Sequence, residues 1–172
     1  MVKQRKDMIE VCQNLFVGNQ DDYESKVAGQ SEWAVVHACK IPYHKLLVGY
    51  TQKALPNTHP EYLFARRDLR LALNMIDGDD PKYTQPVLVD TALDFIHEHV
   101  STDRKTLVHC NQGMSHSPSL ALLYMVKHTD LLPKTSPNDA KTAFLNLYPS
   151  YSPMRGIFGY IEANWSRYAA NN

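Results

Sequence analysis

The chain of 172 residues is long enough for one domain and too short for two of ordinary size, so we expect a single domain over residues 1–172. Hydrophobic residues make up 44% and charged residues 21%, a globular composition that excludes a mainly disordered chain. The 18 lysines and arginines balance 18 aspartates and glutamates, so the chain lacks the basic surplus of proteins that bind nucleic acid or acidic membranes.

The predicted strands and helices alternate along the chain. Short apolar or β-branched runs predict strands at 14–18, 33–39, 71–76 and 105–110, and residues 41–60 form a long surface excursion. Helices are predicted from Pro86 to Val100, where apolar residues recur on one face, and at 118–128, 138–147 and 154–168. This order indicates an α/β fold, with a twisted, mostly parallel sheet of four or five strands flanked by helices on both faces.

A basic run at 66–70 contains three arginines. It could receive a phosphorylated partner, but such a cluster is more often a solvated helix face.

The three cysteines are Cys12, Cys39 and Cys110, an odd number at wide spacings that fits neither a disulfide framework nor a CxxC zinc pattern. Free thiols are typical of a reducing cytosol, and residues 1–10 lack the apolar core of a signal peptide. We therefore expect a cytoplasmic protein. Eight histidines raise the question of a metal site, but their spacings suggest none, and we expect neither a metal nor an organic cofactor.

Residues 108–118 combine the end of a buried strand, a loop and the start of an apolar helix. Cys110 stands where the strand ends, so loop N–H groups and the positive end of the helix surround its thiol. Such surroundings bind an anion and favour the thiolate, the nucleophilic form of cysteine. The expected anion-binding residues are Asn111, Gln112, Gly113, Met114, Ser115 and His116.

Three neighbours of this loop have expected supporting roles. His109 should tune the thiol through hydrogen bonds and pack under the loop, and Ser117 offers a hydroxyl that can assist a departing thiolate. Cys39, at the end of another predicted strand, either forms a protective disulfide with Cys110 or is an ordinary core cysteine.

At these residues the sequence resembles the cysteine-dependent protein tyrosine phosphatases, in their small dual-specificity branch. That family's signature is His-Cys, five residues, Arg, and then Ser or Thr; His109, Cys110 and Ser117 match it, as do the glycine at 113 and the serine at 115. Runs at 14–18, 73–77 and 92–96 resemble the family's opening strand, the strand leading to its general acid, and the next helix. The resemblance implies a dual-specificity phosphatase-like fold and phosphate monoester hydrolysis through a cysteinyl-phosphate intermediate.

His116 stands where the family has its arginine. Arginine grips two phosphate oxygens and stays charged, whereas histidine reaches less far and is often neutral at pH 7. Losing one transition-state donor costs about 10²–10³ in rate. We therefore expect turnover to be strongly impaired, and any residual activity to rise as the pH falls towards 6 and His116 gains charge.

Two aspartates are candidates for the general acid that the resemblance implies. Asp77 ends the strand-like run at 73–76, and Asp79 stands at the distance from the following helix that many dual-specificity members have. Both remain open, with Asp77 preferred.

Two functions follow. The first is a phosphatase impaired by His116, whose substrate is a phosphorylated protein or a small phosphate ester. The second is a catalytically inactive phosphate-binding or scaffolding module that has kept the pocket and lost the reaction.

Overall fold

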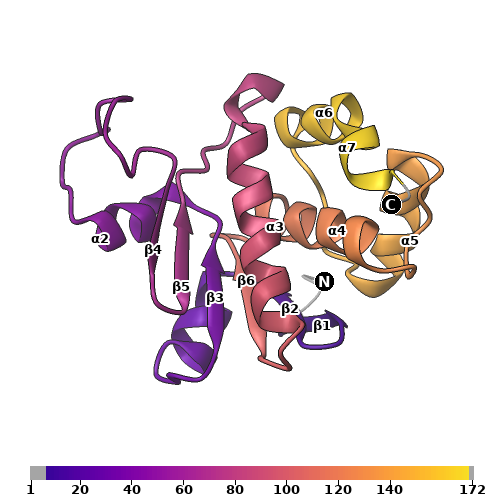
Figure 1. Ribbon diagram of the computed structural model, residues 1–172, viewed down its shortest axis with the longest axis horizontal. Helices are drawn as coiled ribbons and strands as arrows, with labels where there is room; N and C mark the ends of the chain where they lie inside the picture. The colour runs from indigo at the N-terminus through magenta and orange to yellow at the C-terminus, as the bar shows by residue number, and fades with distance from the viewer. Residues whose placement is uncertain (1–6, 171–172) are drawn as a thin grey trace, which may run out of the picture.

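The computed structural model describes residues 7–170, so both ends of the predicted domain, 1–6 and 171–172, lie outside the described part. Within it, one sheet of six strands lies among helices, in the order β1-β2-β6-β3-β5-β4 (Figure 1). The strands are β1 (Ile9–Cys12), β2 (Leu15–Gly18), β3 (Ala34–His37), β4 (Phe64–Arg67), β5 (Arg70–Leu73) and β6 (Thr106–His109). The predicted α/β fold is confirmed, although the predicted count of four or five strands was too low.

The four predicted strands are the inner strands of this sheet. β2, β6, β3 and β5 run parallel to one another, which confirms the mostly parallel prediction. The two strands that the sequence did not indicate, β1 and β4, pair antiparallel at the two edges. Each has four residues and only one buried residue, so its hydrophobic alternation is too weak to recognise.

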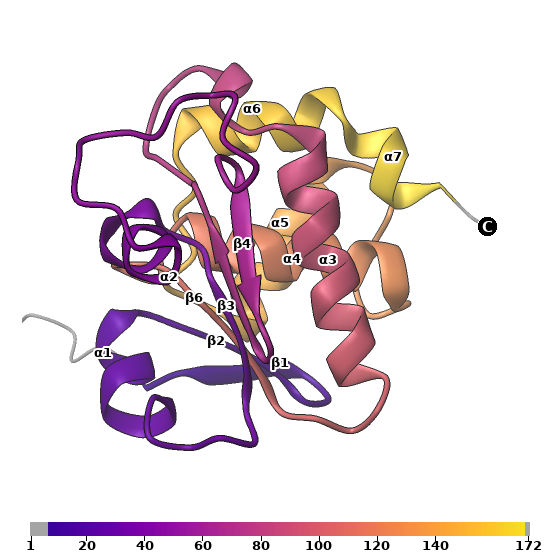
Figure 2. The same ribbon diagram turned by 60° about the vertical axis from the view of Figure 1, so that its left-hand side comes forward.

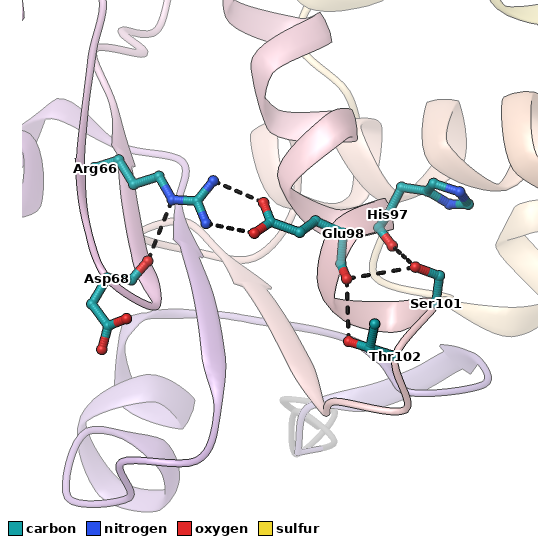
Figure 3. A network of polar contacts seen from close by, with 6 residues as sticks. All are labelled: Arg66, Asp68, His97, Glu98, Ser101 and Thr102. Atoms are coloured by element: carbon teal, nitrogen blue, oxygen red, sulfur yellow. Dashed lines mark hydrogen bonds and ion pairs between the residues drawn. The ribbon is translucent and has the colours of Figure 1, made fainter.

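The basic run at 66–70 forms the β4–β5 hairpin, so its interpretation as a helix face was wrong. Its turn residue Asp68 has φ 51°. Arg66 donates two hydrogen bonds, of 2.8 and 2.9 Å, to the carboxylate of Glu98 on α3 (Pro86–Val100; Figure 3). Arg67 pairs in the same way with Glu61. Both guanidinium groups are thus engaged within the molecule, which weakens the idea that they receive a phosphorylated partner.

Alternate residues of the inner strands face two hydrophobic cores. Val36 and Val108 belong to the larger core, under the helices that follow β5 in the chain. Val35 and Leu107, one position earlier on the same strands, join a smaller core with Val27 and Trp33. Figure 2 shows the strands between α1 on one side and α3 to α7 on the other. The sheet is therefore covered on both faces, as a parallel sheet requires.

The remaining elements are α1 (Gln20–Asp22), the π-helical turns η1 (Tyr23–Val27) and η2 (Lys40–His44), α2 (Lys45–Val48), the 3-10 turn η3 (Pro81–Tyr83), α4 (His116–His128), α5 (Pro137–Leu147), α6 (Arg155–Ala163) and α7 (Trp165–Ala169). The prediction for α3 is confirmed. α4 starts two residues earlier than expected, at His116, and the helix predicted over 154–168 is divided at Asn164, whose ψ of 17° departs from helical geometry. None of the helices within residues 7–170 has both the length and the hydrophobicity to cross a membrane.

α4 is the central helix of the larger core. Its residues from His116 to Val126 are all buried, which fits a sequence that is apolar almost all round. It packs against β2 and β6 below it and against α3, α5, α6 and α7 around it. A helix enclosed in this way has a fixed position, and so does the loop that leads into it.

Buried histidines predict a loss of stability in acid. Burial lowers the pKa of six histidines, to about 4 for two of them, His109 and His128; the others are His37, His44, His99 and His116. The unfolded chain binds protons near pH 6.5, so between pH 6.5 and 4 it carries more protons than the folded protein. We expect the free energy of unfolding in urea, followed by tryptophan fluorescence, to fall over this range. His128→Gln should make the fall shallower, and equal stability at pH 7 and 4.5 would contradict the prediction.

Candidate active site

Cys110 lies at the junction between β6, one of the two central strands, and the central helix α4. β6 ends at His109 and α4 begins at His116, so residues 110–116, here the Cys110 loop, connect the two. The thiol is nearly buried, with the residue 5% exposed, at a cavity of about 160 Å³. That cavity is lined by Asp77, Cys110, Asn111, Gln112, Met114, Ser115, His116, Ser152 and Met154.

Two groups hydrogen-bond with the Cys110 sulfur. The backbone N–H of Gly113 donates to Sγ at 3.2 Å, and the Ser117 hydroxyl lies 3.2 Å from Sγ. Ser117 Oγ is also 3.1 Å from the carbonyl oxygen of Gly18. Because a hydroxyl has a single proton, Ser117 can donate to Gly18 while it accepts from a thiol, or turn its proton towards a thiolate. The arrangement can therefore stabilise negative charge on the sulfur.

The first turn of α4 supplies further donors. No side chain caps this helix end, because the Ser115 hydroxyl instead accepts a hydrogen bond of 3.0 Å from the N–H of Met154. The unpaired N–H groups of a helix's first turn, together with its dipole, favour an anion at that position. An oxyanion in the cavity would meet these groups.

Contacts from distant segments hold the loop in shape. Gly113 has φ +70°, and a Cβ atom there would lie 2.9 Å from the carbonyl oxygen of Gly18, so glycine is required at this position. The Tyr148 hydroxyl donates to the carbonyl oxygen of Gly113 at 2.7 Å. Tyr148 and Met154 could not be predicted as site residues, because both come from segments after α4 and carry no local signal in the sequence.

Asn111 joins the loop to α1 and to η2. Its side-chain amide donates to the carbonyl oxygen of Ile41 at 2.9 Å and to Oε1 of Gln20 at 3.2 Å. Gln112 and Met114 are exposed at the cavity mouth. The loop residues named from the sequence are thus gathered around one opening, apart from Gly113, which lies beneath it.

His116 and Asp77 both line the cavity, and their side chains lie next to each other. The residue is 8% exposed, and its Nε2 lies 3.6 Å from Oδ1 of Asp77. Burial lowers the pKa of His116, and the Asp77 carboxylate with backbone acceptors at Ala38 and Ile76 offsets only part of that effect. The imidazole is therefore neutral at pH 7, and it gains charge at a lower pH than the sequence alone predicts.

The two candidate acids lie at different places. β5 ends at Leu73, so Asp77 is in the following loop and not at the strand end as predicted; its carboxylate is exposed and lines the Cys110 cavity. Asp79 lines a separate depression of about 460 Å³, together with Lys141 and Arg155. The geometry thus places Asp77, and not Asp79, in the cavity of the thiol.

His109 and Cys39 lie beneath the loop. His109 is fully buried, burial lowers its pKa to about 4, and its Nδ1 is 3.3 Å from the carbonyl oxygen of Cys110. Cys39 is a buried free thiol whose pKa is raised to about 12 by burial, so it lies in the structure as a core cysteine and forms no disulfide with Cys110.

The cavity contains no fixed positive charge. Among the described residues that line it, none is lysine or arginine. An anion in this cavity would therefore depend on backbone N–H groups and hydroxyls. Within residues 7–170, no three His, Cys, Asp or Glu side chains are grouped in a way that could hold a metal ion.

A search against known protein families found no match. Solved structures do match over nearly the whole chain. The human tyrosine phosphatase-like serine/threonine/tyrosine-interacting protein superposes with a TM-score of 0.64 and 18% sequence identity, covering 96% of this chain and 100% of that one.

Two phosphatases show a similar agreement. DUSP15 has a TM-score of 0.64 at 18% identity, covering 96% of this chain and 92% of its own. PTPMT1 has a TM-score of 0.62 at 14% identity, covering 95% of this chain and 96% of its own. This chain therefore has the single-domain α/β fold of the dual-specificity phosphatases.

Proposed function

We propose that this protein is a phosphate monoester hydrolase of the dual-specificity phosphatase type, with Cys110 as its nucleophile and with turnover strongly limited by His116. The observation that carries the proposal is the surroundings of the sulfur. Sγ accepts from the Gly113 N–H, contacts Ser117, and lies at a cavity beside the uncapped first turn of α4. A nucleophile and donors for an oxyanion thus share one small site.

The proposed reaction has two steps. The Cys110 thiolate attacks phosphorus, the bond from phosphorus to the ester oxygen breaks, and Asp77 gives its proton to the departing oxygen. Water then attacks the cysteinyl phosphate, Asp77 takes a proton from that water, and the thiolate leaves with Ser117 donating to it. Inorganic phosphate and the alcohol are the products, and Cys110 and Asp77 return to their starting states.

His116 explains why turnover should be slow. The imidazole is neutral at pH 7 and is held among Asp77, Ala38 and Ile76 at the cavity wall, so it supplies no charge to a phosphate dianion. Backbone donors must then stabilise the transition state without a bidentate cation. Phosphorylated proteins and small phosphate esters remain the proposed substrates.

His116→Arg should raise kcat for an aryl phosphate by about 10²–10³, because it restores a charged donor pair at the oxyanion. The matched control His116→Gln has no charge and should give no increase. The rate in both variants should disappear when Cys110→Ser is added. If His116→Arg folds, binds vanadate and remains as slow as the parent, His116 is not what limits the reaction.

In the His116→Arg background, Asp77→Asn should lower kcat for phenyl phosphate by about 10²-fold or more, because the leaving phenoxide is basic and needs a proton. Asp79→Asn is the matched control and should change kcat little, since Asp79 lies outside the cavity. A larger loss in Asp79→Asn than in Asp77→Asn would reverse the assignment of the general acid.

Cys110 should react with iodoacetamide near neutral pH, and vanadate should protect it, because vanadate occupies the same oxyanion site. Cys12 and Cys39, whose pKa values burial raises to about 11 and 12, should react slowly under the same conditions. Mass spectrometry of labelled peptides gives the three rates separately. An unreactive Cys110, or one that vanadate does not protect, would remove the basis of the proposal.

A non-catalytic phosphate-binding or scaffolding module is the second candidate. The lack of a lysine or arginine among the described residues of the cavity lining favours it, and one solved structure of similar fold is described as a phosphatase-like interacting protein. This candidate predicts that a phosphopeptide or phosphate binds the parent and Cys110→Ser equally, and that His116→Arg binds more tightly but still fails to turn over. The His116→Arg assay therefore separates the two functions.

A further inference from the structure

Four aromatic rings lie directly beneath the Cys110 loop. Tyr23 comes from η1, His37 from the end of β3, Tyr43 from η2, and His109 from the end of β6. Their ring centroids are 4.5–5.4 Å apart, and we call the group the four-ring cluster. His37 is 3% exposed and His109 is fully buried. The proposed reaction gives no role to His37.

The two histidines share a short hydrogen bond. Nδ1 of His37 lies 2.6 Å from Nε2 of His109, so one of these nitrogens carries a proton and the other accepts it. On its other side, Nδ1 of His109 lies 3.3 Å from the carbonyl oxygen of Cys110, which can only accept. His109 is therefore protonated on Nδ1 and unprotonated on Nε2. His37 is then the donor of the shared hydrogen bond, from its Nδ1–H to Nε2 of His109.

Ring packing keeps both imidazoles in this orientation. Tyr23 stacks on His109 with an interplanar angle of 1°, and Tyr43 stacks on His37 at 9°. The Tyr43 hydroxyl donates to Oε1 of Glu24 at 2.7 Å, while its ring makes the stacking contact with His37. Stacking fixes the plane of each imidazole, and a 180° ring flip within that plane would place a carbon where the shared nitrogen lies.

We propose that His37 is a positioning residue for the Cys110 loop: by donating to Nε2 of His109, it fixes the tautomer that holds the carbonyl group of Cys110. The consequence follows from peptide geometry. The peptide bond between Cys110 and Asn111 is trans, so its N–H points opposite to its C=O. With the carbonyl oxygen held towards His109 below the loop, the N–H of Asn111 is directed to the other side, where the oxyanion would bind.

This role extends the proposed function, because it assigns to His37 the orientation of the first backbone donor after the nucleophile. Chain continuity alone would not require it. His37 and His109 are 72 residues apart and are brought together because β3 and β6 pair in parallel with His37 opposite His109. The register of two strands thus sets the protonation pattern under the site.

The first test is made on the unaltered protein. Long-range ¹H–¹⁵N correlation spectra distinguish protonated from bare imidazole nitrogens, and they should show His109 with Nδ1–H and a bare Nε2 at pH 7. A spectrum with the His109 proton on Nε2 would overturn the proposal directly, whether or not the protein has any phosphatase activity.

The second test compares His37→Phe with Tyr43→Phe. His37→Phe keeps a stacked ring and removes the donor, so His109 should lose its single tautomer and the carbonyl ¹³C shift of Cys110 should move. The rate of Cys110 alkylation, or the affinity of the protein for vanadate, should fall about threefold to tenfold. A fall of this size is the effect of losing one hydrogen bond. Tyr43→Phe removes only the contact with Glu24 and should leave all of these values unchanged.

The outcomes separate the two proposals. If the spectra change in His37→Phe and not in Tyr43→Phe, His37 has the positioning role, even where vanadate fails to protect Cys110 and the proposed function is lost. If His37→Phe folds with the His109 tautomer and the Cys110 carbonyl shift of the parent, the positioning role is wrong, while the proposed function stands. If His37→Phe does not fold, His37→Asn, which keeps a donor in less volume, should retain the parent tautomer, and a different tautomer there overturns the proposal.

Discussion

The position of one sulfur atom depends on the junction between β6 and α4. β6 is bonded on both sides by parallel strands, and α4 is buried from its first residue to Val126. The short Cys110 loop connects these two fixed elements. Its path is therefore restricted, and Sγ lies beside the first turn of α4 with little freedom to move. Hydrophobic packing thus fixes the polar site on which the proposed function rests.

The same packing limits what the site can do. Backbone N–H groups supply donors at every pH, but they carry only partial positive charge. The buried imidazole of His116 is neutral at pH 7 and adds no positive charge to the site. A cavity of this kind can hold an oxyanion without stabilising it strongly when charge develops in the transition state. Under the proposed function, binding and turnover would therefore be separable, and the residue at 116 would set the difference between them.

The support beneath the loop illustrates how distant residues specify a local geometry. Tyr148 and Ser117 hold Gly113 and Sγ from one side, and His37 acts through His109 from the other. Each contact joins segments that are far apart in the sequence or in different elements. Such contacts preorganise a loop whose own sequence, rich in small polar residues, would otherwise adopt many conformations.

The sequence by itself determined the inner strands, the central helix and the place of Cys110 between them, because hydrophobic periodicity and the strand–loop–helix order are local properties. Only the tertiary structure decided that β1 and β4 complete the sheet, that Asp77 and not Asp79 shares the cavity, and that His37 meets His109. These facts depend on strand register and on how loops cross the sheet's edge. Long-range packing sets both, and no short stretch of sequence carries a signal for it.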